Sequence, residues 1–165
     1  PLSGFDSTMH VPLIFRWPGR IPANQKSDLL VSNYDFLPSL LRLLGLDDDL
    51  PQQPPSPGRD FSSVLTGAAR PDSWEDVVYY EFEKVRAIRT SRWKLLIRIP
   101  DGPHELYDLA NDPGERSNLF GAAEHAETIR SLRETLEQFF RRYADPKYDL
   151  AADGISKAGF LLSDR

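Results

Sequence analysis

Four strand-like segments in the second half of the chain constrain the fold most. They cover residues 77–82, 85–90, 93–99 and 105–109, and the first three are rich in β-branched and aromatic residues. Such residues favour strands. The run Asn111-Asp112-Pro113-Gly114 that follows is a strong turn signal, because each residue type favours turn geometry. We therefore expect a small four-stranded antiparallel meander, with the second and third strands paired as a hairpin.

One amphipathic helix is expected after this meander. Its apolar residues recur three and four positions apart, with charged residues between them, which is the pattern of a helix that buries one face. The apolar stripe consists of Ile129, Leu132, Leu136, Phe139, Phe140 and Tyr143. We expect this helix to lie across one face of the sheet. Its aromatic residues then belong to the core instead of forming a sugar-binding platform.

The first third of the chain predicts a buried strand and a second helix. Residues 11–17 are mostly apolar and end at Pro18-Gly19, as in a strand covered on both faces. Asp35 is placed to cap a helix that Gly45 ends, with Pro38 in its first turn. The apolar positions of this helix are Phe36, Leu37, Leu40, Leu41 and Leu44.

Residues 47–59 are acidic and then rich in proline, which predicts an exposed connection and a subdomain border. The predicted organisation has four parts. Residues 1–50 close a large domain, 51–76 connect, 77–144 form the small antiparallel subdomain with its helix, and 145–165 form a tail. The tail is only weakly periodic up to its apolar end, Gly159-Phe160-Leu161-Leu162. The predicted class of this chain is α+β.

Composition excludes several kinds of protein. The net charge of −5 argues against a nucleic-acid partner, which needs a basic face. The absence of cysteine excludes disulfides and thiolate sites. No apolar run approaches the about 20 residues that span a bilayer. Because the chain begins with Pro1 and soon enters a predicted buried strand, we expect it to be part of a longer protein.

Four segments, in order, resemble the C-terminal half of type I sulfatases of the alkaline phosphatase superfamily. The first covers residues 5–15 and Trp17-Pro18-Gly19, and its His-Val-Pro-Leu-Ile-Phe part is similar to iduronate sulfatase-like proteins. The second covers residues 31–41 and 44–46, and the third Gly58-Arg59-Asp60-Phe61 with Leu65-Thr66-Gly67. The fourth covers residues 87–95 and 105–119, where Leu-Tyr-Asp-Leu-x-x-Asp-Pro-x-Glu-x-x-Asn-Leu is close to a family signature.

The resemblance implies an α/β parent protein with an alkaline phosphatase-like fold that hydrolyses sulfate esters of a sulfated carbohydrate or another small molecule. It also implies a formylglycine nucleophile and a calcium ion, both supplied by a missing N-terminal sulfatase domain, and an extracytoplasmic location. This chain has no cysteine and no Ser-x-Pro-x-Arg motif. We therefore name no catalytic residue, cofactor or metal ligand in it, interpret Asp47-Asp48-Asp49 as a solvated charge run, and expect the chain alone to be inactive.

Five residues are candidates for the wall of a substrate pocket. The resemblance places His10 shortly after the family's catalytic lysine, where its imidazole could hydrogen-bond an anionic substrate; the alternative is a ring bonded to a backbone carbonyl. Glu81, Lys84, Arg86 and Arg89 lie on or beside strands that could lean over the cleft, and guanidinium groups suit sulfate and carboxylate. The alternative for the arginines is cross-strand ion pairing, and Arg89 could instead hold two domains together.

Two other functions remain open. The parent could be a phosphonate monoesterase or phosphodiesterase of the same superfamily, which upstream motifs would distinguish. The chain could also be a non-catalytic structural or binding module. The apolar residues 11–17 argue against the second alternative, because uncovered apolar strands invite association. We accordingly expect the N-terminal third to be aggregation-prone when isolated.

Overall fold

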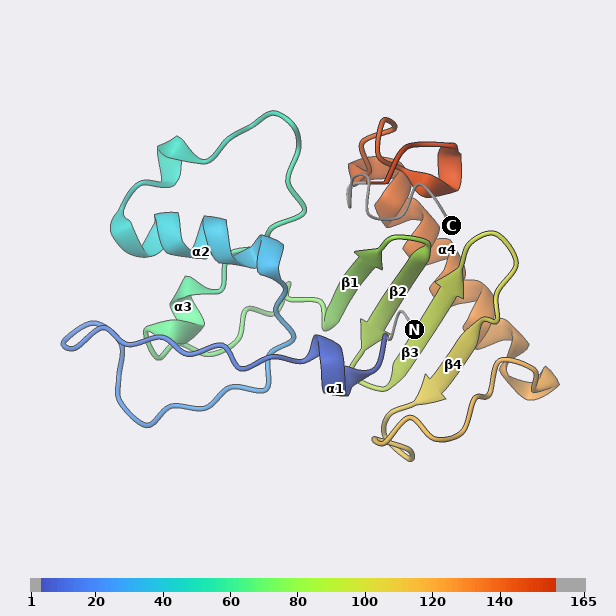
Figure 1. Cartoon of the computed structure of the whole chain (residues 1–165). Helices are drawn as coiled ribbons and strands as arrows, with labels where there is room; N and C mark the ends of the chain where they lie inside the picture. Colours follow the sequence, from blue (N-terminus) through green and yellow to red (C-terminus); the bar gives the residue numbers. More distant parts are fainter. Residues whose placement is uncertain (1–3, 157–165) are drawn as a thin grey trace. The chain divides into compact units, whose positions relative to one another are not determined.

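The computed structural model describes residues 4–156 (Figure 1). These residues form two compact units. One unit is Val11–Val77, and the other combines the residues up to His10 with those from Val78 onward. The chain thus contributes its first described residues to the same unit as its C-terminal half. The predicted borders at residues 50, 76 and 144 concern the longer protein and stay predictions.

The C-terminal half contains the predicted sheet. Its strands are β1 (Val77–Phe82), β2 (Val85–Thr90), β3 (Trp93–Arg98) and β4 (Glu105–Asp108), and they lie in the order β1-β2-β3-β4 (Figure 1). β2 and β3 pair antiparallel, with Ala87 opposite Leu96. β3 and β4 also pair antiparallel, with Leu95 opposite Leu106. The predicted meander and its central hairpin are confirmed.

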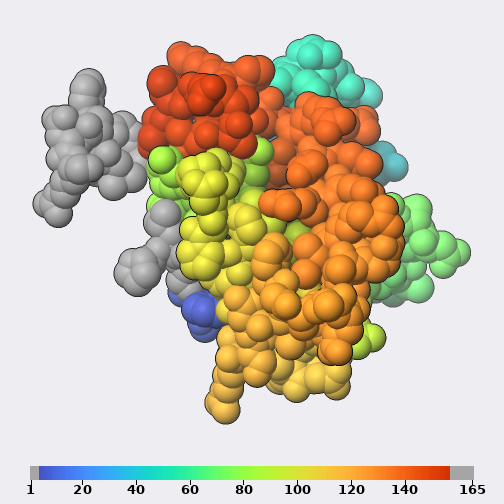
Figure 2. Space-filling model, turned by 90° about the vertical axis from the view of Figure 1, so that its right-hand side faces the viewer, coloured from blue at the N-terminus to red at the C-terminus, as the bar shows by residue number. Residues whose placement is uncertain are grey.

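Helix α4 (Ala126–Tyr143) covers one face of this sheet, as predicted. It follows the 3-10 turn η2 (Ala123–His125) and buries Leu132, Leu136 and Phe140. Figure 2 views the side of the molecule on which the helix, in orange, forms much of the surface. Side chains along a strand point alternately to the two faces of the sheet, and residues paired across strands point to the same face. The paired residues Ile88, Leu95 and Leu106 therefore share one face, and all three are fully buried. The core of this unit therefore lies between α4 and the sheet.

A short helical turn, α1 (Asp6–Met9), lies against the opposite face. This face carries the buried cluster Val85, Ala87, Leu96, Tyr107 and Leu109. The Phe5 ring lies 6.0 Å from the Tyr107 ring, centroid to centroid. The chain approaches so closely that a Cβ at Gly4 would collide with the Leu96 side chain. The sheet is thus covered on both faces, by elements from opposite ends of the described chain.

The unit Val11–Val77 contains α2 (Asn33–Leu44), the 3-10 turn η1 (Asp47–Asp49) and α3 (Ser62–Leu65). Its small core is aromatic: the ring of buried Phe61 lies 5.9 Å from that of Phe15 and 6.4 Å from that of Trp74. The left-handed Gly45, with a φ of 71°, ends α2 as predicted.

The start of α2 differs from the prediction. Ser32, and not Asp35, occupies the N-cap position, and the Asp35 carboxylate accepts a hydrogen bond of 2.8 Å from the Ser32 N–H. This arrangement is a capping box. It lets the helix begin earlier, because it satisfies a backbone donor that would otherwise lack a helical partner. Pro38 consequently lies inside the helix and not in its first turn.

Residues 11–17 do not form the predicted strand. Val11, Leu13 and Ile14 expose 63%, 49% and 85% of their surface, so this chain alone does not bury the segment, and its cover by the sheet of the longer protein stays a prediction. An apolar run becomes a strand only where a neighbouring strand accepts its backbone hydrogen bonds. Within residues 4–156 no strand pairs with this segment.

The residues after α4 include the 3-10 turn η3 (Leu150–Ala152), where the Asp149 side chain accepts a hydrogen bond from the Ala151 N–H. The predicted apolar end, Gly159-Phe160-Leu161-Leu162, lies outside the described residues. Within residues 4–156 no helix has the length and apolar character needed to cross a bilayer.

Candidate functional site

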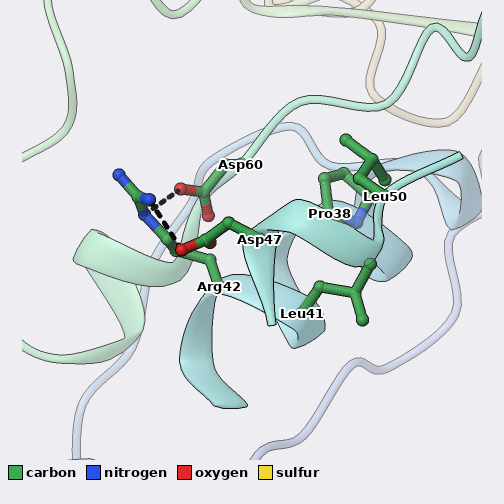
Figure 3. Close-up of a pocket in the computed structure, with 6 residues that line it drawn as sticks. All are labelled: Pro38, Leu41, Arg42, Asp47, Leu50 and Asp60. Carbon is green, nitrogen blue, oxygen red and sulfur yellow. Dashed lines mark ion pairs between the residues drawn. The ribbon is translucent and has the colours of Figure 1, made fainter. Parts of the chain in front are cut away.

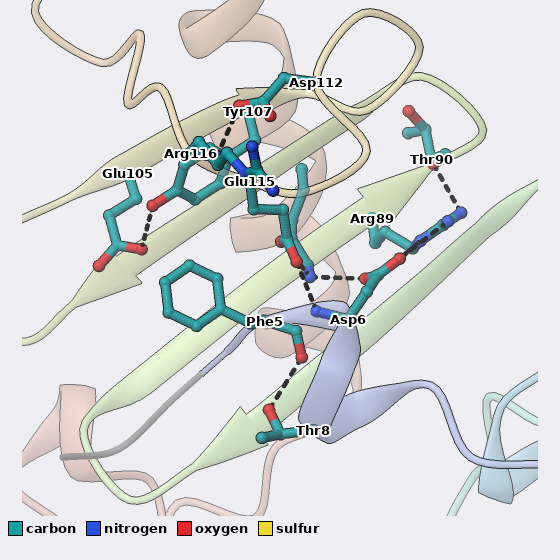
Figure 4. Close-up of polar contacts among 11 residues, drawn as sticks. Phe5, Asp6, Thr8, Arg89, Thr90, Glu105, Tyr107, Asp112, Glu115 and Arg116 are labelled. Carbon is teal, nitrogen blue, oxygen red and sulfur yellow. Dashed lines mark hydrogen bonds and ion pairs between the residues drawn. The ribbon is translucent and has the colours of Figure 1, made fainter.

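Four charged side chains meet where α1 lies on the sheet, and we call them the Asp6 cluster: Asp6, Arg89, Lys94 and Glu115. Lys94 is fully buried, and its Nζ lies 2.6 Å from Asp6 Oδ1 and 2.6 Å from Glu115 Oε1. Arg89 binds the other oxygen of Asp6 at 3.1 Å. The Asp6 N–H donates to Glu115 Oε2 at 2.6 Å (Figure 4). Two cations and two anions therefore balance one another inside the fold.

The register of the sheet explains how these residues meet. Arg89 and Lys94 are direct partners across the β2–β3 hairpin, so both side chains stand on the face that α1 covers. Glu115 follows β4 in a turn and adopts a left-handed φ of 53°. Asp112 supports this turn, because its carboxylate accepts the backbone N–H groups of Arg116 and Ser117. A buried ammonium group needs such carboxylates, since burying it unpaired is very costly.

The charge of Asp6 is stabilised by its cationic neighbours. Burial raises the pKa of this carboxyl group, but the hydrogen bonds from Lys94 and Arg89 together outweigh burial, and the pKa lies below its usual value. Asp6 therefore remains a carboxylate at neutral pH.

His10 lies directly after α1 and is exposed. Its backbone N–H donates to the Asp6 carbonyl oxygen at 2.8 Å. The Asp6 cluster thus fixes the backbone turn that ends at His10. Two of the predicted pocket residues, His10 and Arg89, are connected through Asp6.

The other predicted pocket residues lie elsewhere. Arg86 binds Glu81 at 2.9 Å and Asp149 at 2.6 Å, and its guanidinium group stacks 4.0 Å above the Phe140 ring. Arg86 is therefore on the α4 face, opposite the face of Arg89 three positions later. Lys84 is exposed in the β1–β2 turn. The structure joins Glu81 with Arg86 and His10 with Arg89, and it does not bring the two pairs together.

A second buried ion pair stabilises the unit Val11–Val77. The Asp35 side chain is completely buried, and Arg59 contacts it with its guanidinium NH2 at 2.8 Å and its backbone N–H at 2.8 Å. The same guanidinium group lies 4.1 Å above the Trp74 ring and donates to the carbonyl oxygen of Glu75. With every partner inside the unit, this arrangement indicates a structural role.

A hollow of about 170 Å³ lies beside α2 in the same unit (Figure 3). The residues that line it are Pro38, Leu41, Arg42, Asp47, Leu50 and Asp60. The Arg42 guanidinium group lies 2.9 Å from the Asp47 carboxylate and 3.8 Å from that of Asp60. Because these two carboxylates already balance the positive charge of Arg42, the hollow offers little attraction for a sulfate group.

Comparison with known proteins decides the family. The family of the N-sulphoglucosamine sulphohydrolase C-terminal region matches residues 4–142, a stretch that includes α1, the sheet and nearly all of α4. The chain belongs to this sulfatase family. The resemblance found in the sequence is thereby confirmed, and the alkaline phosphatase-like class with a small antiparallel sheet and C-terminal helix agrees with it.

Curated sulfatases of Bacteroides thetaiotaomicron are similar to most of the chain. An N-acetylglucosamine-6-O-sulfatase is 30% identical over 152 residues, which cover 86% of this chain and 26% of that protein. A Delta 4,5-hexuronate-2-O-sulfatase is 29% identical and covers 92% of this chain and 33% of that protein. The chain therefore spans about a quarter to a third of the length of these sulfatases.

Two solved structures extend the comparison. A structure described as a complex with its substrate D-glucosamine-2-N,6-O-disulfate has a TM-score of 0.65 and 30% identity, covering 78% of this chain and 27% of that one. A phosphonate monoester hydrolase of Agrobacterium radiobacter has a TM-score of 0.53 and 25% identity, covering 68% and 25%. Both sulfate and phosphonate esterases thus contain this sulfatase-type unit.

The calcium ion implied by the resemblance does not fit the described residues. Within residues 4–156 no group of three or more histidine, aspartate or glutamate side chains could hold a metal ion. Asp47, which begins the acidic triplet, is paired with Arg42. A calcium ion requires six to eight oxygen ligands, and no step of the chemistry is assigned to it here.

No sequence pattern predicted the cluster of Asp6, Lys94 and Glu115, although all three residues lie in segments that carry the sulfatase resemblance. One signal was available. Lys94 stands within a mostly apolar strand, next to Leu95 and Leu96, where alternation predicts that its side chain shares the face of Leu96. A lysine there needs a carboxylate partner, but strand alternation alone cannot say which carboxylate provides it.

Proposed function

We propose that this chain is the C-terminal part of a sulfatase that hydrolyses sulfate esters of a carbohydrate. The observation that carries the proposal is the family match across residues 4–142, which includes the turn bearing His10 as well as the sheet. The substrate class is supported by the 6-O-sulfatase relative and by the structure with a disulfated glucosamine. A sulfated amino sugar is accordingly the first substrate to test.

We infer that the nucleophile and the calcium ion belong to the part of the longer polypeptide that precedes this chain. The chain contains no cysteine and no Ser-x-Pro-x-Arg motif from which formylglycine could form. The role left to this chain is to complete the fold and to form one wall of the pocket. An extracytoplasmic location is part of the same proposal and rests on the family resemblance alone.

Within that wall we assign the substrate contact to His10. Its ring is exposed at the end of a firmly held turn, where an imidazole N–H could donate to a sulfate or carboxylate oxygen. Arg89 is occupied by Asp6, so its part is to support this turn. Glu81 and Arg86 stay predictions as pocket residues, and the ion pairs of Arg86 with Glu81 and with Asp149 favour the ion-pair alternative.

The test is to purify the longer polypeptide and to incubate it with N-acetylglucosamine 6-sulfate, N-sulfoglucosamine and a phenyl phosphonate monoester. Ion chromatography measures the sulfate released, and phosphorus NMR measures the phosphonate product. The proposal expects sulfate release from N-acetylglucosamine 6-sulfate at a kcat/KM well above that for the phosphonate. Release from N-sulfoglucosamine alone would instead indicate a sulfamidase, because that sugar carries an N–S bond and no sulfate ester.

The same panel separates the alternatives. The similarity to the phosphonate monoester hydrolase is a specific reason to include the phosphonate, and a clear preference for that substrate would replace the sulfatase proposal. Turnover of neither ester class would favour a non-catalytic module.

A further inference from the structure

Lys94 is the one lysine or arginine among residues 4–156 that is buried to this degree, with a side-chain exposure of 0%. We propose that Lys94 is a positioning residue that fixes, through Asp6, the turn presenting His10 to the substrate. This proposal rests on the proposed function only where it concerns substrate. Its structural part, the control of the turn by Lys94, can be tested without any activity.

The first step of the argument is where the partners of Lys94 come from. Its Nζ bridges a carboxylate of α1 and a carboxylate of the turn after β4, each at 2.6 Å. These two segments are separated by more than one hundred residues, since Asp6 and Glu115 bond to each other with a separation of 109. Lys94 therefore holds together two segments that no local interaction could join.

The second step is that every polar group of Asp6 has a hydrogen-bonding partner. Its backbone N–H bonds to Glu115, one carboxylate oxygen to Lys94 and the other to Arg89. Its carbonyl oxygen accepts the His10 N–H. The position of the His10 backbone thus follows from the position of Asp6. Without Lys94, Asp6 and Glu115 would be two neighbouring carboxylates with one remaining cation.

The third step separates positioning from simple stabilisation. A buried ion pair is often no better for stability than apolar residues of similar volume. The opposite face of the sheet already supplies an apolar core beneath α4. What an apolar residue cannot provide is a fixed direction for Asp6, because apolar contacts are non-directional. The cluster therefore suits the placing of the turn better than the stabilising of the sheet.

The experiment is a double-mutant cycle in the longer polypeptide, assayed with the best sulfated sugar. We expect Lys94→Met and His10→Ala each to raise KM by about tenfold with little change in kcat, the size of one lost charge-assisted hydrogen bond. The double variant should be no worse than the single ones, because Lys94 acts through His10. Additive effects of the two substitutions would overturn the proposal.

Two further variants distinguish a loss of positioning from a simple loss of stability. In Lys94→Met/Glu115→Gln the number of buried charges of each sign is again equal, so we expect Tm to recover towards the wild-type value while KM stays high. If KM recovers together with Tm, the role of Lys94 is stability alone. Arg92→Met is the matched control: Arg92 is in the adjoining β2–β3 turn and pairs with Asp108 outside the cluster, and KM should be unchanged.

Hydrogen exchange followed by mass spectrometry tests the turn directly. In the Lys94 variants, the peptide covering residues 5–10 should exchange faster than in the wild type, whereas peptides of α2 should not change. Unchanged exchange at residues 5–10 overturns the positioning role. If the wild type turns over no sulfate ester, the proposed function fails, and the exchange result still decides whether Lys94 holds the turn.

Discussion

At the scale of single residues, Asp108 is the carboxylate whose ionisation is most clearly tied to the fold. Hydrogen bonds from the Arg92 guanidinium group lower its pKa to about 2, with further help from the Asn111 side chain and the Ala110 N–H. A carboxyl group whose pKa is lowered by folding stabilises the native state above its unfolded pKa. This contribution is lost as pH falls through the folded value.

We therefore expect the free energy of unfolding to decline between about pH 4 and about pH 2, with Asp108 responsible for part of the decline. Asp108→Asn should lower stability at pH 6 and flatten the pH dependence in that window. Urea unfolding at a series of pH values measures both effects. Asp72→Asn, at an exposed position, is the control, and an equal flattening in this control would contradict the assignment.

The Asp35–Arg59 pair predicts a larger effect. Arg59→Met leaves the completely buried Asp35 carboxylate without its cation, and breaking a buried pair in this way costs about 3–5 kcal/mol. Arg42→Met removes an exposed pair between Arg42 in α2 and Asp47 in η1, and it should destabilise the chain much less, because solvent screens such a pair. Chemical unfolding of both variants provides the comparison. Equal losses would show that burial does not determine the strength of these pairs.

At the scale of elements, helix α4 depends on its apolar stripe. Leu136 is 2% exposed at the centre of the stripe. Leu136→Ala should lower the free energy of unfolding by about 2–5 kcal/mol, the usual range when a buried leucine is truncated. Glu137→Ala removes an exposed neighbour and should change stability by less than about 0.5 kcal/mol. Similar losses in the two variants would contradict the packing of α4 on the sheet.

The elements also show what could be predicted from the sequence. The meander and α4 could be predicted because alternation and helical periodicity are local patterns, each visible within a few turns of chain. Residues 11–17 gave the wrong element because a strand depends on a partner that the segment itself does not specify. The Asp6 cluster could not be predicted for a related reason, since Lys94 and Asp6 are 88 residues apart. Pattern places a residue on a face but does not identify its distant partner.

At the scale of the whole molecule, the accessible connection after α2 should be the first site of proteolysis. Residues 51–56 are exposed and carry no helix or strand. Brief digestion of the chain with proteinase K should therefore cut first within residues 47–59 and leave the sheet with α4 intact. Mass spectrometry identifies the fragments. A first cut within residues 77–109 would contradict the predicted order of stability.

The central claim is that this chain contributes a wall and a positioned turn to a sulfatase whose catalytic groups lie outside it. The most direct test measures sulfate release from N-acetylglucosamine 6-sulfate by the longer polypeptide and, in parallel, by the 165-residue chain, using ion chromatography at equal molar concentrations. The account predicts turnover by the longer polypeptide and none by the chain alone. Sulfate release by the isolated chain would contradict it.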